Sequence, residues 1–283
     1  MLIAQITDAH VLPEGQAFRG VVDTGAGLAA AVAALNALHP RPDIVLFTGD
    51  LANDGQGAEY DRLRALLAPL ELPLAAVPGN HDRRAGLRAA LAGNPWLPAG
   101  TGPEDETTRL HQVIEGFALR LIGLDTLDAA MGNGGSLGRE DCAWLEARLA
   151  EAPDRPTVIF MHHPPFATGI GHMDAIACTG AGALARVVAR HPQVLRLLCG
   201  HVHRPVTTGW AGTVACIAPA LCHQVALDLD PEAEAAFVQE PPALMLHLWR
   251  PGGGEEAGAG LVSHILPLGD HGPARSFATG QPR

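Results

Sequence analysis

The sequence predicts an α/β protein whose sheets are mainly parallel. Short apolar runs typical of buried strands alternate with stretches that carry apolar residues at the three- and four-residue spacing of helices. Strands that alternate with helices of this length indicate parallel βαβ units. The expected strands cover residues 2–6, 44–47, 74–77, 157–161 and 194–199, and the expected helices cover residues 28–38, 59–67, 142–149 and 183–189.

A sixth apolar run, at 117–124, ends at Asp125 and Thr126. A lone acid at the end of a strand is more often a turn or cap residue than a metal ligand, so we do not assign Asp125 to a site. The total length of 283 residues suits one large domain, or a large domain with a smaller appendage.

The chain changes character beyond residue 224. Residues 243–249 and 261–268 are strand-like and flank a glycine-rich turn at 251–260, which predicts a small β-hairpin packed on the edge of the core or on a partner chain. The last residues include few large apolar side chains and are expected to be loose. The predicted segments are a main domain at 1–225, a hairpin segment at 226–269 and a loose tail at 270–283.

Composition excludes several classes of protein. The chain carries 19 basic side chains, all of them arginine, against 30 acidic ones, for a formal net charge of −11. The absence of lysine excludes Schiff-base chemistry and any phosphate-binding loop that ends in lysine. The negative charge argues against a nucleic-acid partner, because affinity for the phosphate backbone depends on basic side chains. We therefore expect a small-molecule substrate.

The cysteines and the hydropathy pattern indicate a compartment. The five cysteines are scattered, without the spacing of a zinc site or of a disulfide framework, which is typical of reduced thiols. The N-terminus lacks the basic start and apolar core of a signal peptide, and no apolar stretch reaches 18 residues. We expect a cytoplasmic protein that does not associate with a membrane.

Residues able to bind a metal follow five of the expected strands. Proteins with parallel sheets bind their ligands at the carboxyl ends of the strands. Residues two apart in an extended segment point to the same side, so both can reach one ion. Each motif alone is weak, but five strand ends would not collect Asp, His and Asn by accident. In chain order the motifs are Asp8-x-His10, Gly49-Asp50, Gly79-Asn80-His81-Asp82, His162-His163 and Gly200-His201-x-His203.

The chemistry of the donor atoms in these motifs limits which metal ions the site can bind. A mixed set of imidazoles, carboxylates and an amide suits divalent iron, manganese, zinc or cobalt, and does not suit calcium. About eight donor residues exceed what one tetrahedral zinc ion needs, so two adjacent ions are the simpler account. His81 can sit over a bound phosphate, and Asp82 can orient its imidazole.

This ordered series of motifs resembles the calcineurin-like metallophosphoesterase superfamily over residues 1 to about 225. Within that superfamily the sequence is most similar to the class III cyclic nucleotide phosphodiesterase branch, and in particular to the bacterial glycerophosphodiesterases. The resemblance implies a four-layer α/β/β/α sandwich in which residues 1–225 form the catalytic domain. It also implies that the C-terminal hairpin is a cap or a dimerisation element.

The resemblance further implies roles for individual residues. One ion would be held by Asp8, His10 and His203, the other by Asn80, His162 and His201, with Asp50 bridging the two. His81 and Asp82 would be catalytic, with His81 contacting the phosphate. The substrate-binding residues would be Asn80, His81 and His223. His163 matches the motif but is expected to pack behind the ligands.

The leading functional hypothesis is a dinuclear-metal phosphodiesterase that cleaves small diesters, such as glycerophosphodiesters, by attack of a metal-bound hydroxide. The alternative in the same class is a 3′,5′-cyclic nucleotide (cAMP) phosphodiesterase, because residues at the metals do not separate these substrates. A non-catalytic scaffold is disfavoured by the intact donors, and a nuclease by the net charge. The spare apolar face of the hairpin predicts a homo-oligomer.

Overall fold

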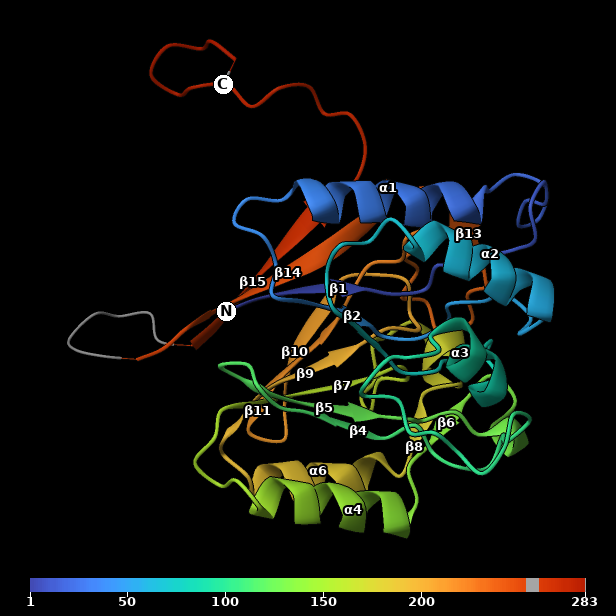
Figure 1. The fold of residues 1–283 in the computed structure, drawn as a ribbon, viewed down its shortest axis with the longest axis vertical. Helices are drawn as coiled ribbons and strands as arrows, with labels where there is room; N and C mark the ends of the chain where they lie inside the picture. The colour runs from blue at the N-terminus through green and yellow to red at the C-terminus, as the bar shows by residue number, and fades with distance from the viewer. Residues whose placement is uncertain (253–259, 283) are drawn as a thin grey trace.

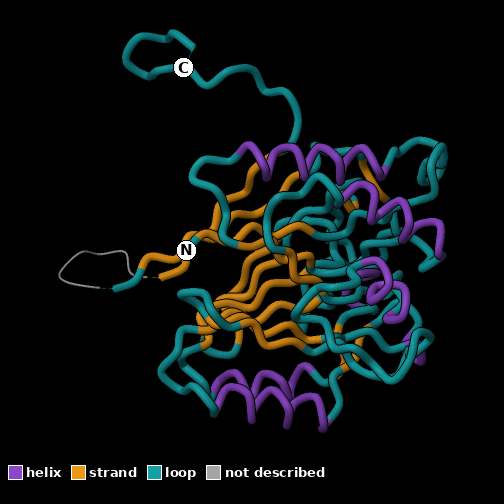
Figure 2. Tube along the Cα trace, viewed as in Figure 1, coloured by secondary structure: helices purple, strands orange, loops and turns teal. Residues whose placement is uncertain are grey.

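A computed structural model of the protein describes residues 1–252 and 260–282 and has four layers (Figure 1). Two β-sheets lie in the middle, and helices cover the outer face of each sheet; Figure 2 shows the strands in orange between the purple helices. One cluster of buried side chains lies between the sheets, and one lies between each sheet and its helices. This arrangement confirms the predicted α/β/β/α sandwich.

The first sheet contains three of the predicted parallel strands and has the strand order β15-β14-β1-β2-β3. Ile3 of β1 lies opposite Ile44 of β2, and Val45 lies opposite Leu74 of β3. The predicted limits of β1 and β2 are correct at both ends, and β3 is one residue shorter than predicted. The bounds are β1 Leu2–Ile6, β2 Ile44–Phe47, β3 Leu74–Ala76, β14 Ala243–Arg250 and β15 Gly260–Pro267.

The two C-terminal strands form the expected antiparallel hairpin and extend the first sheet. β14 pairs antiparallel with β1, with Leu2 opposite Leu248, and β15 pairs with β14. The hairpin is therefore packed on the edge of the core. Most of the predicted turn at 251–260 lies outside the described residues. The domain boundaries after residues 225 and 269, and a role of the hairpin as a cap or dimerisation element, stay predictions.

The second sheet has the order β10-β11-β9-β7-β5-β4. Its predicted members are β5, β7 and β9, and β5 occupies the last five residues of the run at 117–124. The sequence did not reveal β4, β10 or β11, because β4 is three residues long and β10 is half polar. The bounds are β4 Gln112–Ile114, β5 Arg120–Leu124, β7 Thr157–Met161, β9 Val194–Cys199, β10 Val206–Trp210 and β11 Thr213–Ile217.

Two pairs of short strands lie outside the main sheets. β6 (Gly135–Ser136) pairs in parallel with β8 (Cys178–Thr179), and β12 (Gln224–Val225) pairs antiparallel with β13 (Phe237–Val238). Neither pair was predicted, since two-residue strands leave no periodic pattern in a sequence.

The helices α1, α2 and α3 cover the first sheet, and α4 and α6 cover the second (Figure 1). α1 begins four residues earlier than predicted, because the Asp23 carboxylate accepts a hydrogen bond from the Ala26 N–H at 3.1 Å and caps the helix. The bounds are α1 Thr24–Ala37, α2 Gly57–Leu67, α3 Arg84–Ala90, α4 Arg139–Ala150, α5 Gly171–Asp174 and α6 Ala181–Ala189, with a 3₁₀ turn η1 at Ala129–Met131.

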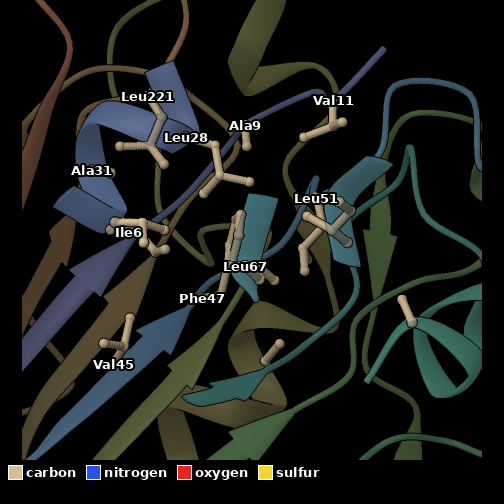
Figure 3. Packing of buried hydrophobic residues seen from close by; sticks show 14 of the residues in the cluster. Ile6, Ala9, Val11, Leu28, Ala31, Val45, Phe47, Leu51, Leu67 and Leu221 are labelled. Atoms are coloured by element: carbon tan, nitrogen blue, oxygen red, sulfur yellow. The ribbon is translucent and has the colours of Figure 1, made fainter. Parts of the chain in front are cut away.

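The core beneath α1 and α2 also holds the loops that carry the motifs (Figure 3). Leu28 of α1 and Leu67 of α2 belong to one buried cluster with Phe47 of β2. Val11, from the loop after β1, and Leu51, from the loop after β2, are fully buried in the same cluster. Because these loops contribute to the core, the polar residues beside them are held on a rigid base.

Two observations bear on the predicted compartment. Among the helices that the structure describes, none combines the length and the apolar character needed to cross a membrane. All five cysteines are buried and free.

Candidate metal centre

Five loops meet at the carboxyl ends of β1, β2, β3, β7 and β9, where the predicted motifs lie. Hydrogen bonds join their backbones: the Asp8 N–H donates to Gly49 O at 3.0 Å, and the Gly200 N–H donates to His162 O at 3.0 Å. The hydrogen bonding between strands thus continues into the loops that follow them. As a result, the motif side chains from the loops of both sheets lie in one cluster.

One group of donors consists of Asp8, His10, Asp50 and His203, whose ligand atoms all lie within 4.8 Å of one another. His10 Nε2 lies 3.0 Å from His203 Nε2 and 3.5 Å from Asp50 Oδ2. His203 Nε2 lies 3.3 Å from Asp8 Oδ1. All four side chains are buried. Imidazole nitrogens that converge with two carboxylates are donors suited to a shared cation.

A second group lies on the other side of Asp50. His162 Nε2 is 3.3 Å from Asp50 Oδ2 and 3.2 Å from Asn80 Oδ1. The ligand atoms of His162, His163 and His201 lie within 4.8 Å of one another. Asp50 is the carboxylate that contacts histidines of both groups.

Backbone carbonyls determine which nitrogen of three histidines is free. A carbonyl oxygen only accepts, so the ring nitrogen that contacts it carries the proton, and the other nitrogen keeps a lone pair for a metal. His10 differs, because its buried Nδ1 makes no hydrogen bond to the described residues. The three hydrogen bonds run from His162 Nδ1 to Thr48 O (2.8 Å), from His203 Nδ1 to His223 O (2.9 Å) and from His201 Nε2 to Ile176 O (3.1 Å).

Both ring nitrogens of His163 are occupied by protein groups. Nδ1 lies 2.8 Å from Thr126 Oγ1, and Nε2 lies 3.2 Å from Asn133 O. The carbonyl of Asn133 requires a proton on Nε2, so the Thr126 hydroxyl donates to Nδ1. His163 therefore has no free lone pair, although it lies beside His162 and His201.

Most of the predicted ligands have a backbone conformation that is rare outside glycine. Among the described residues, seven non-glycine residues have a positive φ. Such a conformation costs about 1–3 kcal/mol for each residue and persists where the surrounding structure enforces it. The concentration of positive φ angles among the donor residues indicates that the function of the site requires this conformation. The five that belong to the donor groups are Asp8 (51°), His10 (45°), Asp50 (52°), His201 (75°) and His203 (55°).

At two positions beside the donor carboxylates there is room only for glycine. A Cβ on Gly79 would overlap the Asp50 carboxylate, and a Cβ on Gly200 would overlap Thr7 and lie 2.9 Å from Asp8 Oδ2. Thr7 Oγ1 donates to Asp8 Oδ2 at 2.6 Å and orients that carboxylate. The mixed nitrogen and oxygen donors fit divalent transition metals.

The two carboxylates stay ionised although they are buried. Burial by itself would raise the pKa of Asp8, but His203 lowers it to about 2. Burial would likewise raise the pKa of Asp50, but His162 and His81 lower it well below its ordinary value. Both groups therefore present negative charge to the cluster at neutral pH.

The predicted pairing of Asp82 with the His81 imidazole is wrong. Asp82 follows a tight turn in which its own N–H donates to Gly79 O, and this turn directs its carboxylate toward backbone amides. The His81 ring donates instead from Nδ1 to Asn53 O at 2.5 Å. Asp82 thus ties the loops after β2 and β3 together. Its carboxylate accepts from the N–H groups of Leu51 (3.1 Å), Ala52 (3.0 Å) and Gly79 (3.0 Å).

His223 lies at the rim of the cluster, in a cavity of about 190 Å³ that Asn80 and His81 also line. Its ring centroid is 4.7 Å from that of His203, and the Phe18 ring stacks on it at 4.3 Å. Burial, and then His203, lower the pKa of His223 to about 3, so the ring is neutral. The three residues predicted to bind substrate therefore share one cavity.

Sequence reasoning missed Arg84, which connects the His81 loop to the second sheet. Its guanidinium is bidentate to Asp125, at 2.6 Å from Nε to Oδ2 and 3.0 Å from Nη2 to Oδ1, and it also donates to Leu127 O at 2.5 Å. Asp125 additionally accepts from the Leu127 N–H at 2.9 Å, which is the turn role predicted for it. Two isolated charges 41 positions apart gave no signal of this ion pair.

Replacing Arg84 by methionine is expected to lower the free energy of unfolding by about 3 kcal/mol, because the buried Asp125 carboxylate loses its bidentate partner and keeps only Arg109, 3.8 Å away. The matched control is Arg190→Met. Arg190 makes an equally short bond to Glu146, 2.6 Å, but both side chains are about half exposed, and this loss should stay below about 1 kcal/mol. Denaturant unfolding measures both. Equal losses of unfolding free energy in the two variants would contradict the assignment of Arg84 and Asp125 as a stabilising buried ion pair.

Comparisons with known proteins agree with this geometry. A family model described as calcineurin-like phosphoesterase matches residues 1–205. A probable glycerophosphodiester phosphodiesterase of Arcobacter nitrofigilis is 37% identical over 270 residues, which covers 95% of this chain and 94% of that protein. The 3′,5′-cyclic adenosine monophosphate phosphodiesterase of Escherichia coli K12 is 31% identical over 222 residues, or 78% of this chain and 76% of that protein.

A solved structure has the same fold. A dimetal phosphatase from Danio rerio matches with a TM-score of 0.62 and 15% identity, covering 95% of this chain and 99% of that one. At this identity the likeness shows the fold alone. The family match and the identity to the two bacterial enzymes confirm the resemblance that the five motifs predicted. The chain therefore belongs to the calcineurin-like phosphoesterase family.

Proposed function

We propose that the protein is a metal-dependent phosphodiesterase that hydrolyses small phosphodiesters such as glycerophosphodiesters. The observation that carries this proposal is a pair of donor groups that share Asp50, beside a cavity lined by histidines and an amide. The relative from Arcobacter nitrofigilis, named for glycerophosphodiesters, matches nearly the whole chain. Donors present at every motif count against a non-catalytic scaffold.

The proposed centre holds two divalent ions, drawn from iron, manganese, zinc and cobalt. When bound, such ions polarise a water nucleophile and neutralise the charge on the phosphate. Asp50, which contacts both groups, would be the carboxylate that the two ions share. Asp8, His10 and His203 would hold one ion, and Asn80, His162 and His201 would hold the other.

The remaining residues of the cavity act on the substrate. The Nδ1 of His81 is engaged with Asn53 O, so His81 acts through Nε2, contacting the phosphate and protonating the leaving alkoxide. His223 is neutral and contributes a hydrogen bond to the bound substrate. Asp82 keeps the Asn80 and His81 segment in place through the three backbone amides.

A cyclic nucleotide phosphodiesterase is the second candidate. The relative from Escherichia coli K12 is named for 3′,5′-cyclic adenosine monophosphate, and it covers 78% of this chain. The match to the glycerophosphodiesterase covers 95%, including the C-terminal hairpin, which is why we place that activity first.

Three substrates separate the two candidates. We expect kcat/KM for glycerophosphoethanolamine to exceed that for cyclic AMP by tenfold or more, with an aryl diester as the measure of intrinsic reactivity. The measurement uses the metal-loaded protein under one set of conditions. A preference of tenfold or more for cyclic AMP would replace the first candidate with the second.

We also propose that the protein is a homo-oligomer in solution. β15 is the edge strand of its sheet, and Val262 (41% exposed) and Ile265 (49% exposed) lie on its opposite faces, so a second subunit docked along this edge would cover both. Sedimentation at micromolar concentration is expected to show a particle at least twice the 29.5 kDa of the chain. A particle of 29.5 kDa alone would contradict this, as would a Val262→Asp and Ile265→Asp double variant with an unchanged oligomeric state.

The proposal extends to compartment and partners. The five buried cysteines without disulfides support a cytoplasmic location. The net charge of −11 supports a small phosphodiester, and not a nucleic acid or a membrane, as the partner.

A further inference from the structure

Two cavities of different character meet at Asn80 and His81, which line both of them. The first, of about 190 Å³, contains the donor groups and has an apolar side made by Phe18, Met173, Ile176 and Val225. The second, of about 350 Å³, is lined mainly by polar and charged residues, among them Asp54, Arg83 and Glu106. The centre of the reaction therefore lies between an apolar side and a charged side.

The apolar side is built by a tight turn. The Phe18 N–H donates to Val22 O at 2.9 Å, and Arg19 (φ 51°) and Gly20 (φ 72°) complete the turn between them. The Phe18 ring lies parallel to His223, with 6° between the planes, and meets the edge of Phe237 at 5.5 Å. This packing fixes a flat aromatic wall in the cavity that also contains His10, Asp50 and His203.

Most charges on the other side already have partners. The Asp82 carboxylate accepts from three backbone amides, and Arg84 is paired with Asp125. The Glu106 carboxylate accepts from the N–H groups of Arg84 (2.8 Å) and Ala85 (3.2 Å).

Two charged groups remain for a ligand. Within the part of the chain that the structure describes, the side chains of Asp54 and Arg83 make no hydrogen bond or ion pair. Both residues are exposed and line the cavity that reaches His81. A carboxylate accepts hydrogen bonds and a guanidinium only donates them, so together they select a group that offers both a donor and an acceptor.

We propose that the Asp54 and Arg83 cavity is a subsite for one arm of the diester, a hydrophilic alcohol with a donor for Asp54 and an acceptor for Arg83. The vicinal diol of a glyceryl group has this chemistry. The other arm lies against Phe18. The cleft thus sorts the two arms of an unsymmetrical diester by polarity. This inference rests on the proposed phosphodiesterase function.

The test compares two diesters that share a leaving group. Glyceryl p-nitrophenyl phosphate and ethyl p-nitrophenyl phosphate release the same phenolate and differ only in the arm that carries the diol. For the metal-loaded protein, the ratio of kcat/KM for the glyceryl diester to that for the ethyl diester is the diol preference. We expect a preference of at least about tenfold, which corresponds to two exposed hydrogen bonds.

Substitutions assign that preference to residues. Asp54→Asn and Arg83→Gln should each reduce it by about threefold, while Arg139→Gln, at an exposed position on α4, should leave it unchanged. Phe18→Leu should lower kcat/KM for both diesters by the same factor and keep the preference. Metal content and circular dichroism of each variant exclude misfolding as the cause.

The outcomes are separable. A wild-type preference near one, or a preference that survives both Asp54→Asn and Arg83→Gln, would overturn the subsite while the phosphodiesterase function stands. A Phe18→Leu variant that loses the preference would also overturn the subsite, because the diol would then lie on the aromatic side. Failure of the metal-loaded protein to cleave either diester would overturn the proposed function itself.

Discussion

Asp50→Asn is expected to lower kcat for an aryl diester by at least about 1,000-fold. Asp50 lies between the two donor groups, 3.5 Å from His10 Nε2 and 3.3 Å from His162 Nε2, and its pKa is held well below the ordinary value. An amide removes the negative charge that lets two cations approach each other. We expect the variant to hold at most one ion per chain, while the wild type holds up to two, as measured by elemental analysis.

Asp61→Asn is the matched control, because Asp61 is an exposed carboxylate on α2 that forms a surface ion pair with Arg64 at 2.8 Å. It should keep both full activity and metal content. Exhaustive chelation of the wild type should abolish hydrolysis, and returning a divalent transition metal should restore it. An Asp50→Asn protein with two ions and normal kcat would contradict the proposed two-metal centre. Activity that persists after the metal has been removed would contradict it as well.

His81→Ala should show a loss that depends on the leaving group. Glycerophosphoethanolamine releases a poor alkoxide that needs a proton, so we expect a decrease of about 100- to 10,000-fold in kcat. An aryl diester releases p-nitrophenolate, which leaves without protonation, and the decrease should be about tenfold. Asn53 O holds Nδ1 of His81, so Nε2 is the atom that supplies the proton.

His223→Ala provides the comparison within the same cavity. His223 is proposed to bind substrate without transferring a proton, so its removal should mainly raise KM and affect the two substrates alike. If His81→Ala reduced both substrates by the same factor, His81 would be a phosphate-binding residue only, and the role of general acid would belong elsewhere.

The clustering of the candidate metal ligands was predictable because each motif follows an apolar run. Residues 2–6 and 44–47 are completely apolar apart from Gln5, and Asp8 and Asp50 come shortly after them. Parallel strands place such positions at one end of a sheet, so the residues could be grouped without knowing how the two sheets pack.

Other parts of the site depend on contacts that no local pattern records. The partner of Asp82 was predicted from its neighbour in the chain, whereas the turn at Gly79 directs its carboxylate to amides of another loop. Phe18 comes from a turn without periodic residues, and its stacking on His223 joins positions 205 residues apart. The strand β10 has too few apolar residues to stand out, since it lies at the edge of its sheet.

The pairing of β1 with β14 has a consequence for how the protein is made. Leu2 is synthesised 246 positions before its antiparallel partner Leu248. Until then one edge of β1 has unpaired backbone groups, which is a point of risk for aggregation during translation. The donor group that contains Asp8 and His10 can be completed only after His203 has been synthesised, so we expect a cation to bind there only once both sheets have formed.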